Sequence, residues 1–216
     1  MIRLHHCPGT RSMRVLWLLY ELAVDFDLEV YPFDKTLRSE AYLKLNPAGR
    51  VPALELDGHI IRESGAILQV LCERFDPRGL GRPLGHKDHV AWLDWIHFAE
   101  TISAHCANLT QQHLMLREDY MRSPIIMKLE AARLGKTLEA TEARLAGDYL
   151  LGSGFSAADV AVGQAVFMAK HFVHLDATPR LAAWYARLAE REAFQAALPD
   201  GDMLYDRDFY APWPVE

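Results

Sequence analysis

The chain has 216 residues, half of them hydrophobic and about a quarter charged, with a formal net charge of −6 at pH 7. This length allows one large or two small domains, and the acidic balance argues against a nucleic-acid partner, which would favour a basic patch. The 3 cysteines form no Cys-x-x-Cys pair and indicate a reducing compartment. We see no signal sequence and no apolar run of membrane-spanning length, so we expect a cytoplasmic protein without a membrane partner.

The first part of the chain alternates between strand patterns and helix patterns. We expect strands over residues 2–5, 26–30, 53–56 and 60–61, and helices over 12–22, 39–45 and 64–75. Asp57-Gly58 is a strong hairpin turn between the last two strands, because glycine tolerates the positive φ that a type I′ turn needs. The order βαβαββα fits a small mixed sheet covered by helices.

The character of the chain changes near residue 77. Asp-Pro, Gly-Leu-Gly and Arg-Pro signals predict a linker over 78–85, after which nearly every segment is helical. We expect helices over 86–116, 124–146, 160–172 and 178–191. Ser123-Pro124 pairs an N-cap with a proline in the first turn, and Ser156 to Asp159 is close to a capping box. The sequence therefore predicts two domains, residues 1–77 and an all-helical domain over 86–216.

One stretch carries a more specific pattern than any other. Asn46-Pro47 is followed by Val51-Pro52, then by the hairpin, and then by Glu63-Ser64 at a helix start. A polar pair at a helix start presents a hydroxyl and backbone N–H groups to an anion. A proline opening a strand indicates an edge, a bulge or a cis bond. Taken alone, Ser64 could be an N-cap, Glu63 a solvated charge and Pro52 an edge proline, so the specificity lies in their joint occurrence.

This pattern resembles the thioredoxin-like domain of cytosolic glutathione S-transferases, and the helical remainder resembles that family's second domain. The resemblance implies an α/β thioredoxin-like N-terminal domain (βαβαββα) followed by an all-α C-terminal domain. In the family the proline is cis, the backbone of the residue before it pairs with the cysteinyl backbone of glutathione, and the Glu-Ser pair grips the γ-glutamyl carboxylate. The glutathione-binding residues implied here are Arg50, Val51, Pro52, Glu63 and Ser64.

The resemblance also implies an acting group just after the first strand, where a Tyr, Ser or Cys of the family faces the glutathione sulfur. This chain has no tyrosine there and offers Thr10, Cys7 and Ser12. Thr10 stands where many bacterial members carry a serine, and its hydroxyl could donate to a thiolate. Cys7-Pro8 resembles the Cys-Pro of glutaredoxins and omega-type transferases, although a free cysteine is more often a small buried apolar side chain. Ser12 could act or only cap the helix, and a backbone N–H or Arg11 stays open.

The implied function is conjugation of the glutathione thiolate to a small hydrophobic electrophile, as in detoxification. Peroxidase or thiol-transferase activity is a variant that is favoured if Cys7 acts. The alternative is a non-catalytic binding or interaction protein that keeps the fold. A homodimer is also implied, and we expect that three aromatic residues of one helix cannot all face one small core: Trp92, Trp95 and Phe98.

Glutathione is the co-substrate that the resemblance implies, and we expect no metal. Two histidine pairs have i, i+3 spacing on predicted helices, His86 with His89 and His171 with His174. No carboxylate or thiol completes either pair at the spacing of a metal site.

Overall fold

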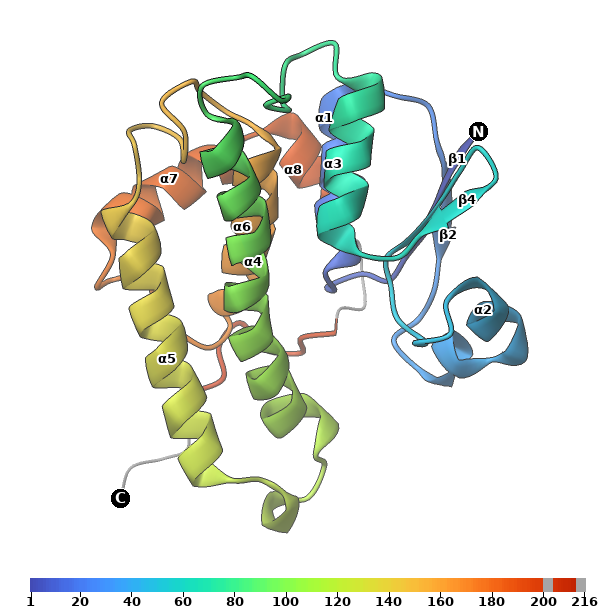
Figure 1. Ribbon diagram of the computed structural model, residues 1–216. Coiled ribbons are helices and arrows are strands. Elements are labelled where there is room, and N and C mark those ends of the chain that lie inside the picture. Colours follow the sequence, from blue (N-terminus) through green and yellow to red (C-terminus); the bar gives the residue numbers. More distant parts are fainter. Residues whose placement is uncertain (200–203, 213–216) are drawn as a thin grey trace. The chain divides into compact units, whose positions relative to one another are not determined.

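The computed structural model describes residues 1–199 and 204–212 (Figure 1). Contacts within the chain define two compact units. The first comprises Met1–Trp92 and Ala189–Leu204, and the second comprises Leu93–Leu188 and Tyr205–Glu216. The linker and domain boundary at residues 78–85 stay a prediction, and residues 200–203 and 213–216 of the expected second domain lie outside the described residues.

The first unit is built on a four-stranded mixed sheet with the strand order β2-β1-β3-β4. The strands are β1 (Ile2–His6), β2 (Asp27–Val30), β3 (Ala53–Leu56) and β4 (His59–Ile61). Strand β1 runs parallel to β2 and antiparallel to β3, which is antiparallel to β4. The parallel pair needs a crossover connection, which the helix between β1 and β2 supplies.

The helical elements of this unit are α1 (Ser12–Leu22), the 3-10 turn η1 (Lys35–Arg38), α2 (Glu40–Leu45), α3 (Ser64–Phe75) and α8 (Glu192–Ala197). Helix α1 is buried at nearly every residue because β1, α3 and α8 all pack against it (Figure 1). The element order up to α3 confirms the predicted thioredoxin-like domain.

Helix α8 packs against α1 although the two helices are far apart in the sequence. Arg191, at the start of α8, donates to both carboxylate oxygens of Glu21 at 2.6 and 2.8 Å. The indole N–H of Trp17 donates to the same carboxylate at 2.9 Å, and the ring of Trp17 meets Phe194 edge-on at 4.9 Å. The sequence predicted one helix to Arg191, whereas α7 ends at Ala189 and α8 is a separate element.

The hairpin between β3 and β4 forms as predicted. Asp57 and Gly58 both have positive φ, 48° and 83°, as a type I′ turn requires. The segment after α3 is held locally, because the Asp76 carboxylate accepts the backbone N–H groups of Leu80 and Gly81 at 2.8 and 2.5 Å.

The second unit is helical, which confirms the predicted all-α domain. Its helices are α4 (His89–Thr110), which begins within the first unit, α5 (Pro124–Ala143), α6 (Ala157–Ala169) and α7 (Pro179–Ala189), with a π-helical turn η2 (Gln111–Met115) and a 3-10 turn η3 (Asp119–Met121). Ser123 caps α5 through its side chain, with Pro124 at the first position. Ser156 and Asp159 form the predicted capping box of α6, which is buried along almost its whole length.

The three aromatic residues of α4 differ in burial. Trp92 and Trp95 are buried within this chain. Trp95 packs edge-on against Phe98, and the guanidinium of Arg144 lies 3.9 Å from the centre of its ring. Phe98 is half-buried, so the core does not enclose all three rings, and the homodimer stays a prediction.

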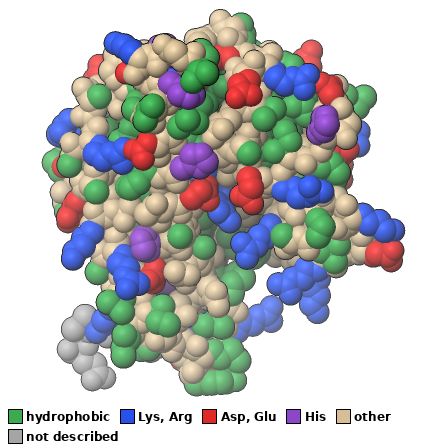
Figure 2. Space-filling view, viewed as in Figure 1, with side chains coloured by type: hydrophobic (Ala, Val, Ile, Leu, Met, Phe, Trp, Pro, Cys, Tyr) green, Lys and Arg blue, Asp and Glu red, His purple; other side chains and the backbone are tan. Residues whose placement is uncertain are grey.

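On the face drawn in Figure 2, Lys and Arg side chains lie among Asp and Glu side chains. No helix in the described ranges is long and apolar enough to cross a membrane. Residues 1–199 and 204–212 contain no group of three or more His, Cys, Asp or Glu that could hold a metal ion. Nδ1 of His89 lies 2.6 Å from the carbonyl of Arg82 instead.

Candidate functional site

The pairing of the strands brings the three predicted parts of the site to one edge of the sheet. His5 of β1 pairs with Ala53 of β3, so the loop after β1 and the residues before β3 leave the sheet on the same side. Leu54 of β3 pairs with Ile61 of β4, so the end of β4 and the start of α3 lie at that edge too. The loop containing Thr10, the Val51-Pro52 segment and Ser64 are therefore neighbours in the fold.

The loop between β1 and α1 is closed by hydroxyl hydrogen bonds. The Thr10 hydroxyl donates to the carbonyl of Cys7 at 2.8 Å and lies 2.9 Å from the Ser12 hydroxyl. Ser12 Oγ accepts the backbone N–H of Cys7 at 3.0 Å, and it lies 3.1 Å from the Cys7 carbonyl oxygen and 2.8 Å from Nδ1 of His6. The structure thus joins the hydroxyls of Thr10 and Ser12 to the backbone of Cys7 in one buried network, and none of these hydrogen bonds involves the Cys7 thiol.

The start of α1 differs from a simple capped helix. Arg11 holds the N-cap position without a side-chain hydrogen bond to the helix, and Ser12 is the first helical residue. The interpretation of Ser12 as the helix cap is therefore wrong. Gly9 has a φ of 73°, and a Cβ there would lie 3.1 Å from the backbone nitrogen of Leu204, so both the turn and the close approach favour glycine.

Cys7 is placed as a buried thiol. Only 1% of the residue is exposed, and its sulfur lies 3.9 Å from the carbonyl of Pro8. Burial raises the pKa of the Cys7 thiol to about 11, and the negative charge of Asp34 acts in the same direction. A thiol in this environment stays protonated near neutral pH, which disfavours nucleophilic attack.

The two adjacent histidines of β1 face opposite sides of the sheet, as the alternation of a strand predicts. Nδ1 of His5 lies 2.9 Å from the hydroxyl of Tyr31, and its Nε2 lies 2.9 Å from Glu55 Oε1. His6 faces Ser12 on the other side. Burial lowers the pKa of His6 to about 4, although the hydrogen bond with Ser12 acts in the opposite direction.

The segment before β3 presents backbone groups outside the sheet. The Val51–Pro52 peptide bond is cis, as the sequence resemblance implies. Strand β3 begins at Ala53, so the backbone of Val51 lies outside the strand ladder. The Arg50 carbonyl just before it is fixed by the hydroxyl of Tyr42 at 2.8 Å and by Nδ2 of Asn46 at 2.6 Å, while Arg50 itself is exposed.

The start of α3 combines a buried hydroxyl with a buried positive charge. Glu63 is the N-cap residue and is exposed, and Ser64 is the first helical residue and is buried. The interpretation of Ser64 as a simple N-cap is therefore wrong. Nη1 of Arg14, a fully buried residue of α1, donates to Ser64 Oγ at 3.0 Å. A guanidinium has no acceptor, so Ser64 Oγ accepts from Arg14, and a hydroxyl and a positive charge lie together at this helix start.

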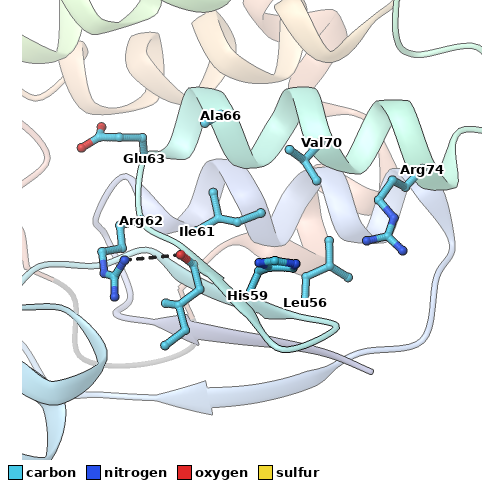
Figure 3. A pocket seen from close by; sticks show the side chains of 9 residues that line it. Leu56, His59, Ile61, Arg62, Glu63, Ala66, Val70 and Arg74 are labelled. Carbon is cyan, nitrogen blue, oxygen red and sulfur yellow. Dashed lines mark hydrogen bonds between the residues drawn. The ribbon is translucent and has the colours of Figure 1, made fainter.

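A groove beside this site runs between β4 and α3 (Figure 3). It is lined by Leu56, His59, Ile60, Ile61, Arg62, Glu63, Ala66, Val70 and Arg74. Glu63 lies at one end and Arg74 at the other, and Arg62 Nη1 donates to the carbonyl of Ile60 at 3.4 Å. Of the predicted site residues, Glu63 alone lines this groove, so the groove adjoins the candidate site without containing it.

Sequence reasoning missed four residues that organise the site: His6, Arg14, Tyr42 and Asn46. Arg14 left a signal, because a charged residue among the apolar residues of a buried helix needs a polar partner. Asn46 was noticed as the first residue of the pattern that ends at Ser64, without a side-chain role. The contacts of His6 and Tyr42 depend on which side chains the fold brings together, and no local pattern reveals them.

Comparisons with known protein families give matches in both parts of the chain. The family model described as "Glutathione S-transferase, N-terminal domain" matches residues 4–79, and the one described as "Glutathione S-transferase, C-terminal domain" matches residues 126–187.

Individual proteins give the same result. The chain is 31% identical over 199 residues to the "Glutathione S-transferase-like protein OpS6" of Beauveria bassiana (strain ARSEF 2860), with 87% of this chain and 89% of that protein covered. It is 28% identical to "Glutathione S-transferase 3" of Schizosaccharomyces pombe, covering 91% and 86%. The structure of the glutathione transferase URE2P8 from Phanerochaete chrysosporium, solved with oxidized glutathione, has a TM-score of 0.82 at 23% identity and covers 91% and 92%. The similarity to this structure supports the fold alone.

Proposed function

The chain belongs to the cytosolic glutathione S-transferase family, and from that premise we propose that it conjugates glutathione to electrophilic, apolar substrates. The thiol of bound glutathione loses its proton to solvent. The sulfur then forms a bond to the electrophilic carbon, and the leaving group departs with its bonding electrons. Thr10 is the acting residue and donates its hydroxyl hydrogen to the thiolate.

The position of the Thr10 hydroxyl carries this proposal. It lies at the N-terminus of α1, where backbone dipoles favour negative charge, and at the sheet edge shared with Val51 and Ser64. A donor at that point favours the thiolate over the thiol, whose free pKa is near 8.5. Only 8% of Thr10 is exposed, so a hydrogen bond to sulfur would meet little competition from water.

The remaining candidate residues bind glutathione in this proposal. The backbone of Val51, before cis-Pro52, pairs with the cysteinyl backbone, and Arg50 lies beside it. Ser64 and Glu63 hold the γ-glutamyl end. The buried guanidinium of Arg14 supports this assignment, because it adds positive charge to the N-terminus of α3 where a carboxylate would bind.

The burial of Cys7 favours conjugation over thiol transfer. A mixed disulfide would require a thiolate at Cys7, and the raised pKa of that thiol opposes it. Ser12 is fully buried and is less suited to touch a substrate than Thr10. Peroxidase activity remains compatible with Thr10, since it also begins from the glutathione thiolate.

The second candidate function is a non-catalytic glutathione-binding or interaction protein. The threonine in place of the family's serine favours it, because the extra methyl group can restrict the hydroxyl. We further propose a cytoplasmic homodimer acting in detoxification. This rests on the family alone, since Trp92 and Trp95 are buried within one chain. Light scattering that finds a 24.5 kDa monomer at micromolar concentration would refute the dimer.

The proposed function is tested by measuring conjugation with a panel of model electrophiles, together with the pKa of the bound glutathione thiol. We expect Thr10→Val, which keeps the shape and removes the donor, to slow conjugation by about a hundredfold and to raise the thiol pKa. Thr10→Ser should keep both values near those of the wild type.

Two outcomes would contradict the proposal in different ways. A wild-type protein that produces no heat with millimolar glutathione in calorimetry would refute the binding site. Binding without turnover of any electrophile, peroxide or mixed disulfide would instead support the non-catalytic alternative.

A further inference from the structure

We propose that His6 and Ser12 are positioning residues that free the Thr10 hydroxyl to donate to the glutathione sulfur. The inference rests on the proposed function, because it takes Thr10 as the residue that faces the sulfur. In the structure the Thr10 hydroxyl is already used, since it donates to the carbonyl of Cys7 at 2.8 Å. A donor that turns away from a buried carbonyl leaves a cost unless another donor replaces it.

Each oxygen in the loop has a limited number of lone pairs, so the position of one hydrogen restricts the positions of the others. When Nδ1 of His6 carries the ring hydrogen, it donates to Ser12 Oγ at 2.8 Å, and the same oxygen accepts the Cys7 N–H at 3.0 Å. Both lone pairs of the Ser12 oxygen are then filled, so its O–H must donate. Its acceptors are Thr10 Oγ1 at 2.9 Å and the Cys7 carbonyl at 3.1 Å. Each N–H and O–H named here then has an oxygen to donate to.

A thiolate beside Thr10 changes only two of these hydrogen bonds. The Thr10 O–H turns from the Cys7 carbonyl to the sulfur, and the Ser12 O–H takes its place at that carbonyl. The backbone N–H of Thr10, which lies 3.3 Å from the same oxygen, stays where it is. The Cys7 carbonyl, which has two lone pairs, therefore keeps two donors, the Ser12 O–H and the Thr10 N–H.

The opposite tautomer of His6 does not permit this exchange. If Nδ1 has a lone pair, the Ser12 O–H donates to the ring and cannot replace Thr10 at the Cys7 carbonyl. The hydrogen on Nδ1 of His6 thus determines in which direction the Ser12 and Thr10 hydroxyls donate.

The surroundings of His6 suit a neutral donor. Only 4% of the residue is exposed, and burial lowers its pKa to about 4. The ring is therefore uncharged at neutral pH, and it is too weak a base to retain the proton of the glutathione thiol. His6 and Ser12 act through Thr10, and neither needs to touch the sulfur.

The test is the pKa of the bound glutathione thiol, followed by the far-ultraviolet absorbance of the thiolate. His6→Phe fills the space of the ring without a donor, whereas His6→Asn keeps an N–H near the position of Nδ1. We expect His6→Phe and Ser12→Ala to raise the thiol pKa by about 0.5–1 pH unit, the size of one lost neutral hydrogen bond. His6→Asn should stay near the wild type. An unchanged thiol pKa in His6→Phe and Ser12→Ala would overturn the inference.

Thr10→Val separates this inference from the proposed function. If Thr10→Val leaves the thiol pKa unchanged, the proposed function itself fails. If Thr10→Val raises it while the His6 and Ser12 variants do not, only the positioning role fails. In the Thr10→Val background His6→Phe should add nothing, because His6 acts through Thr10, and additive shifts would overturn the inference. Affinity for S-methylglutathione, which has no thiol proton, should not change in His6→Phe.

If the variants fail to fold, a measurement on the wild-type protein still tests the inference. Nitrogen NMR of isotope-labelled His6 in the glutathione complex should find the ring hydrogen on Nδ1. A hydrogen on Nε2 would overturn the proposed direction of the hydroxyl chain.

Discussion

A fully buried serine stands at the start of α1, as its first residue, and at the start of α6, as its N-cap, and the two serines have different surroundings. Ser156, at the start of α6, donates to Asp159 Oδ2 at 3.2 Å and accepts the N–H of Ala158 at 3.2 Å. Asp159 also accepts from the backbone N–H groups of Leu150 and Ser156 and from the indole of Trp184, at 2.9 to 3.0 Å. Ser12, at the start of α1, instead lies among a hydroxyl, a carbonyl and a histidine ring.

The difference lies in how many arrangements of hydrogens each network allows. A carboxylate only accepts, so every hydrogen around Asp159 has one direction, and the network fixes a single structure. Hydroxyls both donate and accept, so the hydrogens around Ser12 can turn without movement of heavy atoms. A fixed network suits the assembly of a helical core, and a network with several arrangements suits a site where charge develops.

The largest effect that we expect from breaking either network is at Asp159. Asp159→Ala leaves the donors of Leu150, Ser156 and Trp184 buried without an acceptor. We expect this variant to lose about 3–5 kcal/mol of unfolding free energy, measured by urea denaturation. The pKa of bound glutathione thiol should not change under conditions in which the variant is still folded.

Asp148→Ala is the matched control, because it removes an aspartate of the same unit whose side chain is 79% exposed and paired with Arg187. It should change stability by less than about 0.5 kcal/mol. Equal losses in the two variants would contradict the view that the buried network fixes the fold.

A smaller effect is expected at Ser64, the third buried serine at a helix start. Ser64→Ala should weaken glutathione binding by about 1–3 kcal/mol, measured by calorimetry, because a charged group of the ligand and the Arg14 guanidinium both lose a partner. Ser123→Ala removes a serine that caps α5 and should leave the affinity unchanged. Loss of affinity in both variants would show that helix stability, and not ligand contact, is being measured.

The smallest effect is expected at Cys7. Cys7→Ala should leave conjugation near the wild-type rate, because the buried thiol is not in its reactive form. Since the pKa of Cys7 is raised to about 11, its alkylation by iodoacetamide should be slow near neutral pH and should quicken as the pH rises toward that value. Rapid labelling at neutral pH, or loss of turnover in Cys7→Ala, would indicate that Cys7 is the residue that acts on the glutathione sulfur.

The fold could be predicted from the sequence to a large extent because its signals are local. The helix over 12–22 has the predicted bounds, and Asp57-Gly58, Ser123-Pro124 and Ser156 to Asp159 form the predicted turn and caps. Helix α8 was missed because it has 6 residues and directly follows another helix. The break at Glu190 and Arg191 has no glycine or proline to signal it.

The site could be predicted only in outline. The residues at the sheet edge follow from motif order, so Val51, Pro52, Glu63 and Ser64 were found together. The positions of hydrogens at Thr10 and Ser12 depend on neighbours in space, such as the ring of His6, and no sequence spacing encodes them. The sequence could not reveal the partner of Arg14 for the same reason, because 50 positions separate Arg14 from Ser64.

The pairing of α1 with α8 has a consequence for the order in which the protein matures. A ribosome delivers the chain from its N-terminus, so the sheet and α1 emerge long before Arg191 and Phe194, which lie 170 or more positions after Glu21. Until then the carboxylate of Glu21 lacks its guanidinium and one edge of Trp17 faces water. The nascent first unit therefore stays incompletely closed while the helices from α4 to α7 are synthesised, and it can close only after Arg191 and Phe194 have emerged.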